Sequence, residues 1–336
     1  MRDYNLEKIK KIMASPIGEL IFKAQKVHKR NFKQKDIQLA SLISIKTGSC
    51  PEDCKYCPQS AHYNVDLKKE KLINLLSLEN AAINAKKNGA HRFCMGAAWK
   101  KLRDGEELDT VINMIKTVKS LDLEACVTLG NITKAQARKL KDAGLDAYNH
   151  NIDTSPEFYK EVITTRKFEE RIETINIVRE AGIGVCSGGI LGMGESWDDR
   201  AKMLKILFDM TPHPESIPIN ALVPVKGTPL ENRKKIDSME IIRVIATARI
   251  IMPKSRIRLS AGRKSFNKET QILCLLSGAN SIFYGDNLLT TENNDMYEDK
   301  KLINEYCDVD EKIFNKQKKI NKKNPIKKIV KLNNYA

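Results

Sequence analysis

Short apolar runs alternate with helix-like patterns along most of the chain, starting near residue 39. The apolar runs cover residues 39–44, 92–95, 123–127, 147–151, 184–187, 216–221, 256–260 and 281–284. Apolar residues at helical spacing fill the intervals, at residues 78–88, 106–121, 133–143, 167–181, 198–209, 240–251 and 268–276. Several predicted helices end at a glycine, where a left-handed C-cap allows an abrupt return into a strand: Gly89, Gly144, Gly182 and Gly278.

This alternation predicts an α/β fold with eight strands, arranged as a closed (β/α)8 barrel of the TIM type. A doubly wound open sheet is the alternative that the same pattern allows. We expect residues 1–37 to form an N-terminal helical extension of two short helices, interrupted at Pro16. The barrel is expected to cover residues 38–308, and residues 309–336 are expected to form a lysine-rich tail that is partly disordered.

Composition limits the class of protein. With 336 residues, 41% of them hydrophobic, the chain can bury one substantial core. The formal net charge is +16, but no stretch interleaves aromatic with basic residues as single-strand binders do, so we expect no nucleic-acid partner. No apolar run is typical of a signal peptide or a membrane span. A cytoplasmic, reducing location is therefore expected, and it favours metal binding over disulfides for the eight cysteines.

Three cysteines lie in one short loop. Cys50, Cys54 and Cys57 follow the spacing C-x3-C-x2-C. Three thiolates in a tight loop suit a 4Fe–4S cluster, whose fourth iron stays open to a small molecule. The alternative is a structural zinc site with His62 as a fourth ligand. The loop resembles the signature of the radical S-adenosylmethionine superfamily, in which the open iron binds S-adenosylmethionine and one-electron cleavage gives a 5′-deoxyadenosyl radical.

Three further cysteines, Cys94, Cys126 and Cys186, lie near the carboxyl ends of predicted strands. A single cysteine in an apolar strand is more often an inert core residue. Because a barrel of this type places its chemistry at this end of the strands, their shared placement favours ligands to a second iron–sulfur centre. Cys274 lies on an apolar helix face and is expected to be a core residue, and Cys307 has no companion ligand.

Polar residues also gather at the predicted strand ends. By strand alternation Asn149, Asn151 and Asp153 share one face, with His150 on the other. Amides and a carboxylate that point into a barrel suit a ureido group and ribose hydroxyls. The glycine-rich residues 188–195 would let the backbone approach a flat ligand such as adenine. Arg258 is expected to point inward and to need an anion or an unusual partner, with an ordinary salt bridge as the alternative.

Together these features resemble the biotin synthase family, from about residue 15 to about residue 292. The resemblance is carried by residues 50–60, Cys94, Cys126, residues 148–155, Cys186 with the glycines after it, and residues 217–220, 226–230, 258–263 and 278–285. The first motif is shared across the superfamily. The combination of the three strand cysteines with Arg258 is far more specific.

The resemblance implies two sets of ligands and two sets of contacts. Cys50, Cys54 and Cys57 would hold a 4Fe–4S cluster that binds S-adenosylmethionine. A 2Fe–2S cluster would be held by Cys94, Cys126, Cys186 and Arg258. S-adenosylmethionine would contact Tyr56, Asn151, Asp153, Gly188, Gly189, Ile190, Gly192 and Glu195. Dethiobiotin would lie near Asn149, Asn151 and Asn220.

The implied activity is the insertion of sulfur from the 2Fe–2S cluster between C6 and C9 of dethiobiotin, which yields biotin. No side chain would act as an acid or a base. The implied partners are a reducing electron-transfer protein of the flavodoxin or ferredoxin kind, the iron–sulfur assembly machinery and a second copy of the chain in a homodimer, with no membrane involved. The alternatives are another radical S-adenosylmethionine barrel, such as a hydrogenase-cofactor maturase, and a non-catalytic iron–sulfur protein that binds nucleic acid.

Overall fold

The computed structural model describes residues 4–33 and 36–307. Its centre is a parallel sheet made of β1 (Gln38–Lys46), β2 (Arg92–Ala97), β3 (Glu124–Thr128), β4 (Ala147–Asn149), β5 (Gly184–Cys186), β6 (Gly189–Leu191), β7 (Ser216–Ala221), β8 (Arg256–Leu259) and β9 (Ser281–Phe283). The sheet closes because β1 pairs with both β2 and β9, and because β5 pairs with both β4 and β7. The prediction of a closed barrel is confirmed, and the open sheet is excluded.

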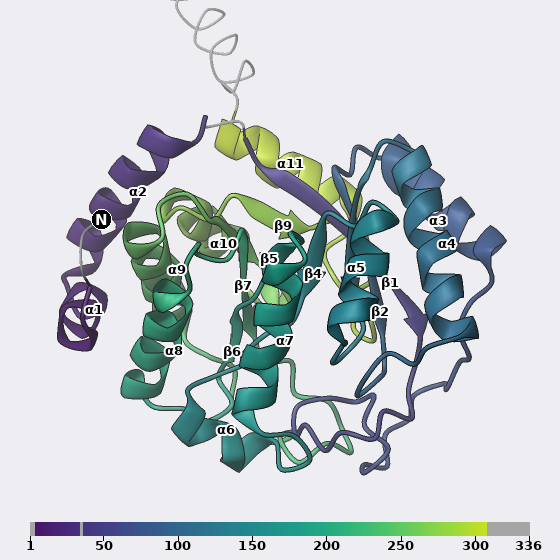
Figure 1. Cartoon of the computed structure of the whole chain (residues 1–336). Coiled ribbons are helices and arrows are strands. Elements are labelled where there is room, and N and C mark those ends of the chain that lie inside the picture. Colours follow the sequence, from purple (N-terminus) through teal and green to yellow (C-terminus); the bar gives the residue numbers. More distant parts are fainter. Residues whose placement is uncertain (1–3, 34–35, 308–336) are drawn as a thin grey trace, which may run out of the picture.

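Helices surround the barrel (Figure 1). The first two, α1 (Leu6–Met13) and α2 (Ile17–Asn31), precede it and are separated at Pro16, as predicted. The others are α3 (Leu75–Lys87), α4 (Glu106–Ser120), α5 (Lys134–Asp142), α6 (Pro156–Val162), α7 (Phe168–Glu180), α8 (Trp197–Asp209), α9 (Ser238–Ile251), α10 (Lys268–Leu276) and α11 (Met296–Cys307). α1 packs against α8 and α9, and α2 packs along α9. The sequence pattern did not predict α6 or α11.

Helix termini follow from particular residues. α5 begins with a capping box, in which Thr133 Oγ1 accepts from Gln136 N and Gln136 Oε1 accepts from Thr133 N. The predicted glycine C-caps have φ from 71° to 103°, in the left-handed region: Gly89, Gly144, Gly182 and Gly278. Each of these glycines therefore ends a helix and turns the chain toward the next strand.

The fifth strand of the barrel is interrupted. β5 ends at Cys186 and β6 begins at Gly189, and because both pair with β7 they fill one strand position together. The backbone between them packs too closely for a side chain. A Cβ at Gly188 would lie 2.0 Å from Pro218 O, and a Cβ at Gly189 would lie 2.1 Å from Met203 Sδ. The pattern predicted one run at residues 184–187 and did not show this break.

Side chains fill the barrel at the amino ends of its strands. Arg92 is 1% exposed, and it contacts Glu124 Oε2 through Nε at 2.8 Å and Glu215 Oε1 through Nη2 at 2.7 Å. We call these three residues the amino-end plug. Further along the interior lies a small apolar cluster of Ala40, Cys94, Cys126 and Ala147. The space left for a ligand therefore lies toward the carboxyl ends.

A buried histidine joins α2 to the barrel. His28 is 3% exposed and stacks on Phe32, with 5.5 Å between ring centroids. The Arg249 guanidinium lies 4.7 Å from the Phe32 ring centroid and donates to Gly278 O. Burial, with the nearby charge of Arg249, lowers the pKa of His28 to about 4.

The described ranges 4–33 and 36–307 contain no helix that is both long and apolar enough to span a membrane. The barrel strands run from Gln38 to Phe283, and α11 follows them. The predicted lysine-rich tail, residues 309–336, falls outside the described residues.

Replacing His28 with Gln should change how stability depends on pH. The folded-state pKa of about 4 lies below the usual value of 6.5, so protonation favours the unfolded chain. The contribution of His28 is therefore present above pH 6.5 and is lost as pH falls toward 4. The free energy of unfolding, measured by urea titration across this range, should fall more steeply for the parent than for His28→Gln. Equal slopes of unfolding free energy against pH in the two proteins would contradict the lowered pKa of His28.

Replacing Gly188 with Ala should destabilise the fold by about 1–3 kcal/mol, because the new Cβ meets the backbone oxygen of Pro218, which cannot move without disturbing β7. Gly18 in α2 is the matched control, since a Cβ there meets nothing within 4 Å. Gly18→Ala should leave the free energy of unfolding unchanged or raise it by less than about 1 kcal/mol. Urea titration measures the free energy of unfolding of both variants. Equal changes in the two would contradict the close packing at Gly188.

Candidate active site

One cavity of about 340 Å³ opens at the carboxyl ends of the strands and reaches into the barrel. Six of the seven predicted cluster ligands line it: Cys50, Cys54, Cys57, Cys94, Cys126 and Arg258. The seventh, Cys186, is 1% exposed and lies beside the lining residue Asn149, whose Nδ2 is 3.3 Å from Cys186 Sγ. The structure therefore brings residues from five strands or their following loops to a single cavity.

The first thiol set lies in the loop after β1, which we call the cysteine loop (residues 50–60). Cys50 N donates to Gln59 O at 2.9 Å, and Cys57 N donates to Cys54 O at 2.9 Å, so the backbone folds tightly and presents all three thiols to the cavity. Burial raises the pKa of the Cys57 thiol to about 12 and also raises the pKa values of Cys50 and Cys54. Thiolates there need a bound cation, which the irons of a cluster would supply.

The geometry does not favour the zinc alternative. His62 Nε2 lies 3.1 Å from Pro51 O, so its ring contacts the backbone of the loop. His62 N also bonds to Ser60 Oγ at 3.1 Å. No group of three histidine, cysteine, aspartate or glutamate side chains in the described part of the chain converges closely enough to hold a single metal ion.

The second thiol set lies deeper in the barrel. Cys94 of β2 stands opposite Cys126 of β3, and Cys186 of β5 stands opposite Asn149 of β4. A hydrogen bond shared by Cys94 and Cys126 lowers the pKa of Cys94, which the positive charge of Arg258 lowers further. The same hydrogen bond, with burial, raises the pKa of Cys126. Paired buried thiols that face a guanidinium are a donor set that fits an iron–sulfur group.

Arg258 faces these thiols from β8 and is 1% exposed. Its Nε donates to Ser281 Oγ at 2.9 Å, its Nη2 donates to Gln38 Oε1 at 3.2 Å, and its guanidinium lies 4.9 Å from the Phe283 ring centroid. No ion pair of Arg258 occurs within residues 4–33 and 36–307, so the salt-bridge alternative is not supported. A buried guanidinium held by neutral groups keeps its charge available to a ligand in the cavity.

The loop after β4 supplies polar side chains, but not by strand alternation. β4 ends at Asn149, and Asp153 has a φ of 67° that turns the chain back. Asn149, Asn151 and Asp153 all line the cavity, as predicted. His150, which was predicted on the opposite face, is buried and is also among the residues that line the cavity. Burial lowers the pKa of His150 well below its usual value, and its Nε2 has no hydrogen-bond partner within the described structure.

Asp153 is held by a residue that the sequence reasoning missed. Arg171 of α7 contacts Asp153 Oδ2 through Nη2 at 2.7 Å and donates to Asn151 O through Nη1 at 2.9 Å. Tyr56 OH donates to the same Asp153 oxygen at 2.8 Å. These bonds join the cysteine loop to the loop after β4. Arg171 lies inside an ordinary helical pattern, and no local signal distinguishes it.

The glycine segment divides into two parts. Ile190 lines the cavity. The other predicted residues of this segment are not among the lining residues of the described cavity: Gly188, Gly189, Gly192 and Glu195. Gly188 and Gly189 are required by the close packing described above, and Glu195 accepts from Gly192 N at 2.9 Å and from Arg200 Nε at 2.7 Å. Contact of these four residues with S-adenosylmethionine stays a prediction.

The predicted amide of Asn220 also lines the cavity. Its Nδ2 donates to Gly189 O at 3.0 Å, and its Oδ1 accepts from Ala261 N at 3.2 Å. Asn151 Oδ1 accepts from Asn149 Nδ2 and from Gly188 N, both at 3.2 Å. The three amides are thus fixed in orientation by neighbouring groups.

Comparison with family models divides the chain into two matched regions. Residues 44–207 match the radical SAM superfamily, and residues 218–306 match the biotin and thiamin synthesis associated domain. Together the two regions include β2 to β6, β8, β9, the end of β1 and most of β7.

Solved structures match in fold. A methylornithine synthase superposes with a TM-score of 0.78 at 18% identity, over 94% of this chain and 96% of that chain. The FeFe-hydrogenase maturase of Carboxydothermus hydrogenoformans superposes with a TM-score of 0.75 at 18% identity, over 90% and 75% of the two chains. At this level of identity these similarities show the fold alone.

Curated relatives are much more similar in sequence. The biotin synthase of Methylorubrum populi is 56% identical over 302 residues, which is 90% of this chain and 89% of that protein. The biotin synthase of Allorhizobium ampelinum is 58% identical over 302 residues, 90% and 92% of the two chains. That of Prochlorococcus marinus is 54% identical over 316 residues, 91% and 94% of the two chains. The chain therefore belongs to the biotin synthase family, whose members are radical S-adenosylmethionine sulfurtransferases.

Proposed function

We propose that this protein converts dethiobiotin to biotin by inserting sulfur between C6 and C9, with the sulfur donated by a 2Fe–2S cluster. The observation that carries the proposal is the single cavity lined by the three residues of the first thiol set, by Cys94 and Cys126 of the second, and by three asparagines. Family membership supports the reaction class. The cavity supports the finer assignment, because it offers one space in which a substrate can meet two inorganic groups.

The ligands follow from the two thiol sets. Cys50, Cys54 and Cys57 would hold the 4Fe–4S cluster. The 2Fe–2S cluster would be held by Cys94, Cys126, Cys186 and Arg258. When bound, the first cluster and S-adenosylmethionine supply a 5′-deoxyadenosyl radical that removes hydrogen from carbon, and the second cluster supplies sulfur. The protein would contribute orientation and the exclusion of water.

The amides suit the substrate. A ureido ring presents two N–H donors and one carbonyl acceptor, and amide side chains offer both kinds of group. Asn149, Asn151 and Asn220 line the cavity and are fixed by the bonds described above. Asp153, held by Arg171 and Tyr56, is oriented to accept from ribose hydroxyls of S-adenosylmethionine. No side chain is needed as an acid or a base, because the reacting carbon–hydrogen bonds carry no acidic proton.

The reaction implies partners of stated chemistry. A low-potential electron-transfer protein of the flavodoxin or ferredoxin kind would reduce the first cluster. The iron–sulfur assembly machinery would load both clusters, and a homodimer is the proposed oligomeric state. The test of the whole proposal is an anaerobic assay with dethiobiotin, reductant and S-adenosylmethionine, read by mass spectrometry as the gain of one sulfur atom and the loss of two hydrogen atoms, one from each of C6 and C9. Absence of that product from fully loaded enzyme would refute it.

Cys54→Ala should abolish 5′-deoxyadenosine formation, because the cysteine loop would keep only two of its three ligands. Chromatography of the anaerobic reaction mixture measures this product. Cys274→Ala is the control, since Cys274 is also a buried thiol and lies in α10. Formation of 5′-deoxyadenosine by Cys54→Ala at the parental rate would remove the first ligand assignment.

Cys126→Ala should abolish biotin formation and leave single-turnover 5′-deoxyadenosine formation detectable, because it disrupts only the deeper thiol set. The reconstituted parent should contain about six irons per chain and the variant about four. Iron analysis and biotin quantification on the same samples check both values. Biotin formation at the parental rate by Cys126→Ala would exclude the sulfur-donor assignment.

A further inference from the structure

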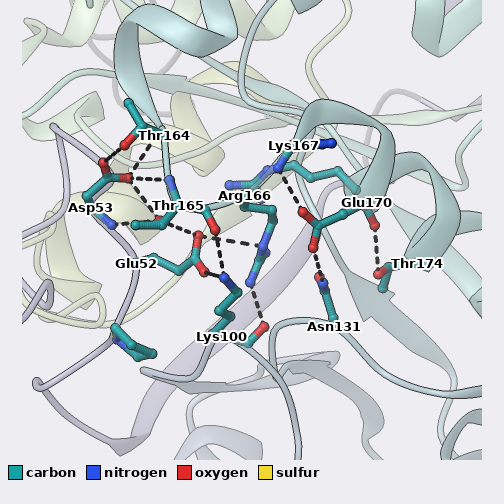
Figure 2. A network of polar contacts seen from close by, with 12 residues as sticks. Glu52, Asp53, Lys100, Asn131, Thr164, Thr165, Arg166, Lys167, Glu170 and Thr174 are labelled. Atoms are coloured by element: carbon teal, nitrogen blue, oxygen red, sulfur yellow. Dashed lines mark hydrogen bonds and ion pairs between the residues drawn. The ribbon is translucent and has the colours of Figure 1, made fainter.

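The cysteine loop is attached to the connection between α6 and α7, which contains none of the predicted cluster ligands or substrate contacts. We call residues 163–167 the docking connection. Figure 2 shows Asp53 facing Thr164 and Thr165 of this connection. Asp53 Oδ1 accepts from Thr164 N at 2.9 Å, from Thr165 N at 3.1 Å and from Thr165 Oγ1 at 2.9 Å. Asp53 Oδ2 accepts from Thr164 Oγ1.

The backbone of the cysteine loop is bonded to the same region. Asp53 N donates to Thr165 Oγ1 at 3.1 Å, and Lys55 N donates to Val162 O at 3.0 Å. These two amides flank Cys54, so the loop is fixed on both sides of its central thiol. The Thr165 hydroxyl therefore accepts from the loop backbone while its own proton is available to a carboxylate.

A second carboxylate of the loop meets the same hydroxyl. Glu52 is 4% exposed, and its Oε2 lies 3.0 Å from Thr165 Oγ1 and 3.6 Å from Arg166 Nε. Lys100, which follows β2, contacts Glu52 Oε1 at 3.3 Å and donates to Thr165 O at 2.6 Å. The charge of the buried carboxylate is thus balanced by two cations, and Thr165 lies at the centre of the network (Figure 2).

This arrangement matters because the cysteine loop contains little regular structure. The structure gives it turns and isolated bridges in place of a helix or a strand. A loop of this kind loses conformational entropy when it closes on a cluster, and prior attachment reduces that cost. The contacts of Asp53 and Thr165 come from the protein alone, so they can form before any iron is bound.

We propose that Asp53 and Thr165 are positioning residues, which hold the cysteine loop in its ligating conformation before the cluster is assembled. The inference rests on the proposed role of Cys50, Cys54 and Cys57 as ligands. Thr165 is the most sensitive point, because removal of its hydroxyl leaves Asp53 N without its acceptor and takes away the single hydroxyl proton that Thr165 can donate to either Asp53 or Glu52. Valine has nearly the same shape as threonine, whereas serine keeps the hydroxyl.

The experiment compares Thr165→Val with Thr165→Ser in the full-length, iron-free protein under anaerobic conditions. Hydrogen–deuterium exchange read by mass spectrometry on peptides covering residues 50–57 should be faster in Thr165→Val on the order of tenfold, since a lost bond to a charged network weakens protection by about this factor. Thr165→Ser should exchange close to the parental rate. This measurement uses no cluster and no activity.

The second readout is cluster assembly. On addition of ferrous iron and sulfide, Thr165→Val should load the first cluster several-fold more slowly, followed by visible absorbance and by electron paramagnetic resonance of the reduced cluster. Thr174→Val is the control, because it makes the same kind of threonine-to-valine change elsewhere and the Thr174 hydroxyl donates to Glu170 O within α7, away from the cysteine loop. Thr174→Val should leave both loop exchange and the loading rate at parental values.

The outcomes separate this inference from the proposed function. Parental exchange and parental loading in Thr165→Val would overturn the positioning role. If the parent itself bound no cluster at the cysteine loop, the proposed function would fail, yet the exchange data would still report on docking. Should Thr165→Val not fold, as judged by circular dichroism, Asp53→Asn takes its place. It keeps one acceptor oxygen but loses the charge, and unchanged exchange and loading there would equally overturn the inference.

Discussion

Closure of the parallel sheet is the constraint on which the rest of the structure depends. The pairings of β1 with β9 and of β5 with β7 bring together strand ends that are distant in the chain. Only then do the loop after β1, the loop after β4 and the inner face of β8 border one cavity. In an open sheet, Arg258 would lie several strands away from Cys94. The candidate site is thus a product of the global topology, and no local segment contains it.

Within the cavity, the buried thiols and the nearby guanidiniums determine what kind of ligand can bind. Burial raises the pKa values of the cysteine-loop thiols, while the guanidiniums of Arg166, Arg171 and Arg258 also line the cavity. A site that combines buried thiols with fixed cations suits an iron–sulfur group. The irons of such a group would take the thiolates, and the guanidiniums would offset the net negative charge of a thiolate-ligated cluster.

A structural feature could be predicted from the sequence when residues close together in the chain determine it. Helix and strand periodicity and the spacing of Cys50, Cys54 and Cys57 are local, so the barrel and the cysteine loop could be predicted. Asn151 and Asp153 were predicted to point into the barrel for the wrong reason, because β4 ends before them. No sequence pattern marks Thr165 or Arg171 as part of the site. Thr165 meets Glu52, which is 113 residues away, and nothing in either neighbourhood encodes that pairing.

The amino-end plug has a bearing on the order of events in a catalytic cycle. Arg92, held by Glu124 and Glu215, fills the amino end of the barrel, and the described cavity opens at the opposite rim, which the cysteine loop borders. If the inner thiol set holds the sulfur donor, as proposed, a sulfur atom spent there would be restored through that same rim, after the sulfur-containing product had left. Restoration of the sulfur donor would then have to wait for release of the product. The residence time of the product would therefore set the time between successive turnovers.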